Sequence, residues 1–541
     1  MRRSSILGFS LFVGFACGPG DPATASGGAD ASGGEEATSA TGDDDAGQTS
    51  EAVDESGEST ASEPEFEPYP ARGITLTEIY ADHGVHVPVY RDGAWVDGSG
   101  RNAELIANRN TLIRAYWELE PDFEPRVIEG RLVLTQPDGS QESASRLFMV
   151  EGNSVPNDLD TNIYFIAPAE LVTPGVQFHI ELYETTDDLR DTPEPAQSVF
   201  PAEPAYIGIE STPMELQVVI VPIDHDTGAQ CPEPPEITDD ELQYLSDQLF
   251  MQNPVNRVVM TRRDPIAYTQ SMNSFNGVLG FLADLRATDG ADPAAYYYGV
   301  VRPCDGGPDG VGGQAISIPG FPSMDNGWAR TSVGRWYGSL SSTANTFVHE
   351  VGHTQGRRHI FCNGDEGGTD PSYPYDAGDI GVWGFGSQDF SLHSPTASKD
   401  YMTYCGNTWV SDWTWRQVSP YIRELTSWGA QGPVGQPEGH VLVGLVDPES
   451  GDETWFTTPG KATALPADGN ELVRWTSTEG VVTALDAVIT PMGDAGAYAI
   501  VSDLPEELSA AQFGTLTRLH DGVEISIDSL RSEGQQYMLS N

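Results

Sequence analysis

The chain has little positive charge. Its 541 residues include 27 Lys and Arg against 81 Asp and Glu, which gives a formal net charge of −54. Phosphate groups repel such a chain, so the composition argues against nucleic acid and against an anionic membrane surface as partners. Long apolar runs are also scarce, and the run at residues 6–16 is too short to cross a bilayer as a helix. The acidic surface favours solubility, with some carboxylates left to bind calcium.

The N-terminus has the features of an export signal. Arg2 and Arg3 precede the short apolar run, and Cys17 follows it directly. This arrangement resembles a bacterial lipoprotein signal, which is cleaved before the cysteine that then carries lipid. The leucine usual in such signals is replaced by Gly14, so secretion without lipid is the alternative. We expect a signal at 1–17 and, because residues 18–68 are acidic and of low complexity, a disordered linker there.

A chain of 541 residues is long enough for about three or four domains. Period-two alternation of apolar residues, broken by turn residues, predicts a β-sandwich over 70–212. Strand and helix patterns alternate over 214–430, which predicts an α/β (α+β) domain. From 435 to 541 the strand pattern returns and predicts a second β-sandwich. Within the middle domain, a helix is expected to begin near residues 339–342.

That helix carries the strongest motif of the chain. Residues 349–359 read H-E-x-x-H-x-x-G-x-x-H without a mismatch. His349 and His353 are four residues apart, so a helix places both rings on one face. Gly356 allows the turn that ends the helix, and the turn brings His359 back as a third ligand. Three histidines leave one position of a zinc ion open for water, and Glu350 can act as its general base.

The motif resembles that of the metzincin zinc proteases. This family has a methionine turn beneath the zinc, and the segment 400–405 contains Met402 at a suitable place. The resemblance implies that Met402 packs under the histidines and that Tyr404, two residues later, binds zinc at rest and stabilises the oxyanion. It also implies that residues 312–320, which resemble the edge strand of that family, form the sheet edge to which a peptide substrate adds. With a β domain ahead of the protease and Tyr404-Cys405 after the methionine, the chain resembles the secreted bacterial proteases that cleave mucins.

Four cysteines remain after Cys17, and four allow three pairings, with unpaired thiols as a further alternative. The resemblance places Cys362 and Cys405 on both sides of the metal, and on that basis we expect the disulfides Cys362–Cys405 and Cys231–Cys304. Two other groups of residues have no motif. Residues 363–370 form an oxygen-rich loop that can bind calcium but lacks the EF-hand spacing, so a solvated loop is expected. His225 and His393 are expected to lie on the surface or in loops.

The sequence therefore predicts a metzincin-like catalytic domain flanked by two β-sandwich domains. The expected activity is that of an exported zinc endopeptidase that cleaves extracellular proteins or glycoproteins. A non-catalytic surface adhesin that contains zinc is the alternative, although it gives no reason to keep Glu350 and all three histidines. A zinc hydrolase acting on another bond is a third hypothesis. We expect a monomer without a nucleic-acid partner, which contacts a membrane only through lipid on Cys17.

Overall fold

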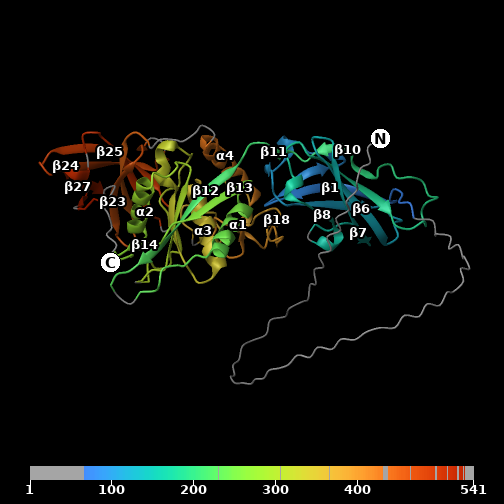
Figure 1. Ribbon diagram of the computed structural model, residues 1–541, viewed down its shortest axis with the longest axis horizontal. Helices are drawn as coiled ribbons and strands as arrows, with labels where there is room; N and C mark the ends of the chain where they lie inside the picture. Colours follow the sequence, from blue (N-terminus) through green and yellow to red (C-terminus); the bar gives the residue numbers. More distant parts are fainter. Residues whose placement is uncertain are drawn as a thin grey trace, which may run out of the picture. The chain divides into compact units, whose positions relative to one another are not determined.

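The computed structural model has a mixed α+β fold in which strands predominate (Figure 1). It describes residues 66–156, 158–228, 231–304, 306–364, 366–429, 437–462, 465–493, 496–508, 510–520, 523–527 and 529–530. The expected signal, Cys17 and nearly all of the acidic linker lie outside these residues. Residues 69–541 form one compact unit, so the domain limits within it stay predictions. No helix among the described residues is long and apolar enough to span a membrane.

Two antiparallel sheets follow the start of the described chain. They face each other, as the edge-to-face contact of Phe148 with Phe165 shows, and this arrangement agrees with the predicted sandwich. The first sheet has the order β3-β2-β1-β5-β8, with strands Ala94–Trp95, His86–Arg91, Ile74–Asp82, Thr111–Leu119 and Ile163–Ala167. The second has the order β10-β9-β6-β7, with strands Val199–Tyr206, Gln177–Glu184, Arg126–Thr135 and Gln141–Val150. A short parallel pair, β4 (Leu105–Ile106) and β11 (Ile209–Glu210), completes this region.

The middle of the chain forms a six-stranded sheet of order β13-β12-β15-β17-β16, in which β14 also pairs with β12. All pairs are parallel except that of β16 with β17, so β16 is an antiparallel edge strand. Every residue of β15 is buried, as expected for a strand covered on both faces. The strands are β12 Glu215–His225, β13 Arg257–Arg262, β14 Ile266–Tyr268, β15 Tyr296–Val301, β16 Gly313–Ala315 and β17 Thr331–Arg335.

Helices cover both faces of this sheet. Helices α1 (Asp239–Gln252) and α3 (Leu340–Thr354) share a core with alternate residues of β12 and β15, and α2 (Asn276–Thr288) packs on the opposite face. Thr238 caps the N-terminus of α1 and forms a capping box with Glu241. After α3, the short strands β18 (Gly384–Phe385), β19 (Leu392–His393), β20 (Lys399–Asp400) and β21 (Thr408–Trp409) lead to α4 (Asp412–Gly429).

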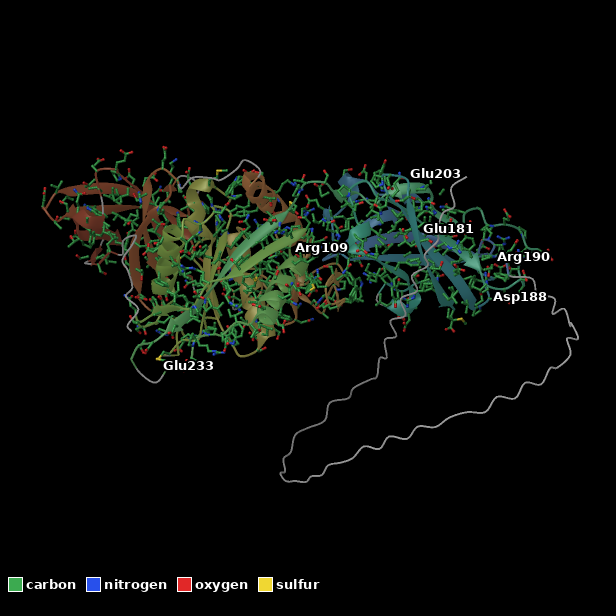
Figure 2. All side chains as sticks on the ribbon, viewed as in Figure 1. Arg109, Glu181, Asp188, Arg190, Glu203 and Glu233 are labelled. Carbon is green, nitrogen blue, oxygen red and sulfur yellow. A yellow bond between two sulfur atoms is a disulfide. The ribbon has the colours of Figure 1, made fainter. Side chains whose placement is uncertain are left out.

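The buried side chain of Arg109 joins the first sheets to α1 (Figure 2). Its guanidinium donates hydrogen bonds to the backbone oxygens of Phe250 at 2.7 Å and Met251 at 3.1 Å, both in the last turn of the helix. It also donates to Asn253 and Val255 just beyond that turn and to His83 in the first region. One side chain therefore satisfies carbonyl groups that the end of a helix leaves without partners.

The C-terminal region differs from the sandwich expected over 435–541. Its described residues form a single antiparallel sheet of order β23-β22-β26-β25-β24-β27-β28. One face packs on α2, where Gly280 leaves space for Phe456, and the other face builds a separate core around Trp455 and Trp475. The strands are β22 His440–Val446, β23 Glu453–Pro459, β24 Gly469–Ser477, β25 Val482–Pro491, β26 Tyr498–Leu504, β27 Phe513–His520 and β28 Val523–Ile527. The helix on one face takes the place of a second sheet.

Candidate metal centre

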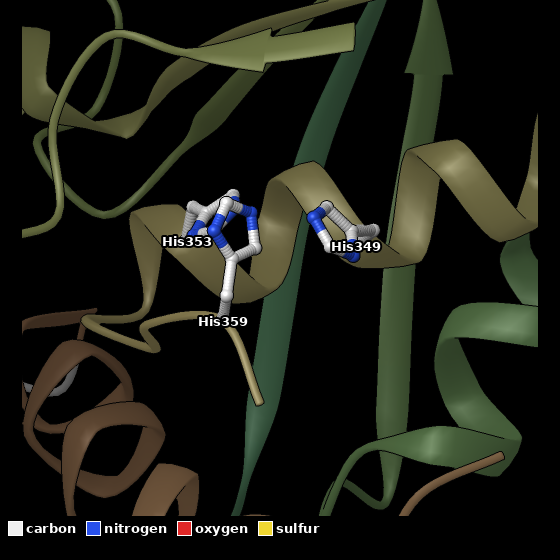
Figure 3. Close-up of side chains that lie close together, drawn as sticks. All are labelled: His349, His353 and His359. Carbon is white, nitrogen blue, oxygen red and sulfur yellow. The ribbon is translucent and has the colours of Figure 1, made fainter. Parts of the chain in front are cut away.

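Helix α3 brings three histidines together. Ser339 caps its N-terminus, and the helix ends at Thr354, two residues before Gly356, whose φ is +80°. A Cβ at Gly356 would lie 2.3 Å from the backbone oxygen of Pro319, so only glycine fits this turn. The chain then returns with His359, whose ring lies beside those of His349 and His353 (Figure 3). One ring nitrogen of each histidine lies within 4.8 Å of the others, and all three side chains are buried.

The backbone fixes the tautomer of each ring. The Nδ1 atoms of His349, His353 and His359 each lie 2.7 Å from a backbone oxygen, those of Tyr401, Arg357 and Gly367 respectively. A carbonyl oxygen only accepts, so each Nδ1 carries the hydrogen and each Nε2 presents a lone pair. The Nε2 atoms of His353 and His359 are 3.1 Å apart. Backbone support of this kind is typical of histidines that bind a metal, and the donor set fits a metal ion.

Glu350 belongs to the same cleft as the histidines. The cleft has a volume of about 760 Å³, and its walls include His349, Glu350 and Gly313 of the edge strand. A Cβ at Gly313 would lie 2.7 Å from Oε1 of Glu350, so this glycine lets the carboxyl approach the strand. Burial raises the pKa of the Tyr298 hydroxyl well above its usual range, and the charge of Glu350 adds to this shift. Tyr298 therefore stays protonated near the carboxyl.

The methionine turn lies against α3 at Gly352, between His349 and His353. Met402 is fully buried, and a Cβ at Gly352 would lie 2.5 Å from its sulfur. Tyr401 contacts the same glycine and also supplies the oxygen that holds His349. The ring of Tyr404 lies 4.8 Å from that of His359, and the side chain is 43% exposed on the cleft wall. Met402 thus lies against the helix that carries His349 and His353, and Tyr404 lies beside His359.

Two acidic residues to which the sequence motifs assign no role hold this turn in place. Asp400 is buried and accepts a hydrogen bond from the amide of Met402 at 2.9 Å and others from Ser411 and Thr414. Burial raises the pKa of Asp400 although these bonds oppose the shift. Glu366 accepts from the amide of Tyr404 at 3.3 Å. Its position in the oxygen-rich loop was visible in the sequence, but its backbone partner was not.

Both expected disulfides are present. Cys231 pairs with Cys304, and Cys362 pairs with Cys405, with Cα atoms 4.6 and 6.3 Å apart. The second disulfide joins the loop after His359 to the methionine turn. Glu366 lies close to its two sulfurs, but sulfurs in a disulfide are not thiolate ligands, so this group does not form a second thiolate site. Calcium binding by residues 363–370 stays a prediction. Disulfides indicate an oxidising compartment outside the cytosol.

The expectation for His225 was wrong. Its side chain is buried at the end of β12, where Nδ1 accepts a hydrogen bond from the amide of Cys304 and Nε2 donates to the oxygen of Gln270, both at 2.9 Å. The ring therefore supports the Cys231–Cys304 segment. His393 is partly buried and stacks on Trp409 with ring centroids 3.8 Å apart, and burial lowers its pKa to about 4. Neither residue takes part in the candidate metal centre.

Comparisons with known proteins add little to this site. No family model matches the chain, and no curated protein matches it. Among solved structures, metalloproteinase-II from Bacteroides fragilis is similar at 10% identity and a TM-score of 0.20, over 46% of this chain and 78% of that chain. A similarity this low supports no conclusion about fold or function, so the functional argument rests on the residues.

Proposed function

We propose that this protein is an exported zinc endopeptidase of the metzincin type that cleaves extracellular proteins or glycoproteins. One observation carries the proposal. Three histidines present Nε2 lone pairs to one another, with each Nδ1 bound to a backbone oxygen, and Glu350 lines the same cleft. Zinc accepts three imidazole ligands in its catalytic sites, and a glutamate next to the first histidine is the usual base in such motifs.

The residues around the cleft have distinct roles in this proposal. Zinc held by His349, His353 and His359 would polarise the peptide carbonyl and make water nucleophilic near neutral pH. Glu350 takes a proton from the attacking water and delivers it to the leaving amine. The ring of Tyr404 lies beside that of His359 on the cleft wall, so its hydroxyl is the donor that would stabilise the oxyanion. Met402 supports the metal-binding helix from below.

The decisive experiment compares the full-length protein with Glu350→Gln on casein. We expect both proteins to contain about one zinc per chain and only the wild type to cleave, because the substitution keeps the ligands and removes the base. A chelator should abolish cleavage, and added zinc should restore it. If both proteins bind zinc and neither cleaves any protein, a zinc-containing adhesin replaces this proposal. If the wild type binds no zinc, the assignment of the three histidines fails.

Export and lipidation form a separate part of the proposal. The two disulfides support an oxidising compartment, and Cys17 at the end of the signal supports lipid attachment. Mass spectrometry of the N-terminal peptide should find Cys17 as the first residue, carrying acyl chains. The variant Cys17→Ser should leave the membrane fraction. An unmodified Cys17 in the medium would show secretion without lipid.

A further inference from the structure

The edge strand β16 has one side paired and one side turned outward. Gly312 accepts a hydrogen bond from the amide of Arg335, and Ile316 donates to Thr331, so these residues bond inward to the chain of β17. In an antiparallel ladder, successive residues direct their backbone groups to opposite sides. The N–H and C=O groups of Gly313 and Ala315 therefore point to the outer edge. An extended peptide that adds to this edge would meet these two residues.

The C-terminal region already occupies the edge at Ala315. The amide of Gly493 donates to the oxygen of Ala315 at 3.0 Å, and the amide of Ile318 donates to the oxygen of Pro491 at 3.1 Å. Along the edge from Ala315 to Ile318, the hydrogen-bonded residues of the C-terminal region run in the opposite direction, from Gly493 back to Pro491. The end of β25 therefore adds to the edge in antiparallel direction, in the manner of a bound peptide.

This contact is close to the metal centre. A Cβ at Gly493 would lie 2.8 Å from the amide nitrogen of Ala315 and 3.0 Å from Cδ2 of His353, so a residue with a side chain could not approach so far. Gly312 and Gly313 line the cleft, whereas Ala315 does not. Glu449 and Gly496, which follow β22 and β25 in the C-terminal sheet, line it as well. The C-terminal sheet thus forms one end of the cleft.

We propose that the segment Pro491–Gly493 limits the substrate to one or two residues on the N-terminal side of the cleaved bond. A peptide that pairs with the edge in antiparallel direction would place its N-terminal residues beside Ala315 and its C-terminal residues beside Gly313 and Val311. The first of these places is taken by the chain itself. The enzyme therefore recognises its substrates chiefly through residues C-terminal to the cleaved bond.

The limit of one or two residues follows from strand geometry. Glu350, the proposed base, contacts the strand at Gly313. Ala315 is two residues further along, a distance of about 7 Å in a strand. A peptide bond placed beside Glu350 therefore has room for about two residues before it meets Gly493. This inference rests on the proposed peptidase function, because it concerns the substrate of the same site.

Two ladders of peptides test the inference on the full-length enzyme. Starting from one cleaved peptide, one ladder adds residues at its N-terminus and the other adds them at its C-terminus. We expect kcat/KM to rise about two- to tenfold for each added residue that pairs with the C-terminal side of the edge, the gain that a net hydrogen bond provides. Beyond the second residue on the N-terminal side, kcat/KM should stay level or fall.

A loop variant sharpens the test. Met492 and Ala497 pair across the end of the hairpin, so residues 493–496 can be replaced by Asn-Gly, which forms a two-residue turn. This change removes the contact with Ala315 and keeps the buried Met492 and Ala497. We expect kcat/KM of this variant to rise with N-terminal extensions longer than two residues. The matched control replaces residues 478–480 by Asn-Gly at the opposite end of β25, and it should keep the wild-type pattern.

The outcomes separate this inference from the proposed function. Equal gains in both ladders of the wild type, or the same pattern in the loop variant, would overturn the inference while the peptidase function stands. Hydrogen exchange gives a readout that does not need activity, since the Gly493 amide should be protected in the wild type by its bond to Ala315. An unprotected amide also overturns the inference. If neither ladder nor casein is cleaved, the proposed function fails, and this inference fails with it.

Discussion

Two groups of buried histidines among the described residues are built differently. In the candidate metal centre, backbone oxygens hold the Nδ1 atoms of all three rings, and the Nε2 atoms lie close together. In the first β region, His83 and His86 are equally buried. There, Nε2 of His83 accepts a hydrogen bond from the amide of Ile106. Nδ1 of His86 lies 2.5 Å from Oδ1 of Asp82, whose other oxygen accepts a hydrogen bond from Arg114.

The difference shows what makes buried histidines a metal site. Burial and proximity are common to both groups, whereas only the first directs its remaining lone pairs to one point. In the second group, the ring nitrogens face an amide, a carboxylate and a guanidinium of the protein itself, so they do not converge on a point where a metal ion could bind. The second group therefore contributes to the stability of the first β region, whereas the first group is arranged to hold a metal ion. Four substitutions or conditions would break or sharpen this comparison.

The largest effect is expected from removing one ring of the metal centre. His359→Ala should lose its bound metal and nearly all proteolysis, because the loss of a direct ligand exceeds the roughly 10- to 100-fold cost of losing an outer partner. Metal analysis and casein cleavage measure both effects. The comparison variant His83→Ala should keep its metal and its rate per folded molecule. A similar loss of metal in both variants would contradict the distinction between the two groups.

A substitution in the second group should lower the stability of the protein and leave the cleavage rate of the folded molecules unchanged. Arg114→Leu leaves the charge of Asp82 buried without its guanidinium partner, since both side chains are fully buried. We expect the free energy of unfolding to fall by about 3–5 kcal/mol, as measured by urea denaturation, with an unchanged rate for the folded fraction. Adding Asp82→Asn should recover part of the loss. A variant as stable as the wild type would show that the ion pair is dispensable.

Lowering the pH should reduce the free energy of unfolding through His83 and His86. The effect should be gradual and smaller than that of Arg114→Leu. Burial lowers the pKa values of His83 and His86, so the folded protein holds both rings neutral. The unfolded chain takes up protons near pH 6.5, so the stability is complete above that pH and is lost as the pH falls below it, by up to about 1.4 kcal/mol per pH unit for each ring. Urea denaturation with a chelator present, at pH 7.5 and 5.5, measures the slope. His83→Gln should reduce it, and an equal slope would contradict the assignment.

The smallest effect is expected beneath the metal centre. Met402→Leu keeps the volume of the buried side chain, and such exchanges cost less than about 1.5 kcal/mol. Thermal unfolding should therefore change little, and cleavage should persist. The larger change Gly352→Val should disturb the same contact severely, because a Cβ there would lie 2.5 Å from the sulfur of Met402. Equal effects of the two variants would show that the contact does not position the helix.

Local patterns predicted much of the site. The spacing of His349 and His353 placed both on one helix, and Gly356 marked the end of that helix, because both signals depend on neighbours in the sequence. The disulfides followed from the family resemblance. The partners of Asp400 and Glu366 could not be predicted in this way, since they are backbone amides brought close only by the folded turn.

In the fold, too, local elements could be predicted from the sequence, whereas contacts between distant segments could not. The helices α1, α2 and α3 and the strands around them were visible as apolar patterns of the right period. The arrangement of the C-terminal strands was not, because alternation predicts a half-buried strand without saying whether a helix or a second sheet covers it. For the same reason, the contact of Gly493 with Ala315 had no signal in the sequence. His225 looked like a surface residue because its partners are distant backbone groups.

The position of Arg109 has a consequence for the order in which the chain is made. This arginine lies in the first β region, yet it binds the carbonyl groups at the end of α1, more than 140 residues later. Since a chain is synthesised from its N-terminus, the first sheets can fold and fix the guanidinium before that helix emerges. A chain that began at residue 214 would lack this partner. The first β region therefore acts as a built-in template for the region that carries the candidate metal centre, and the two should be inherited and expressed together.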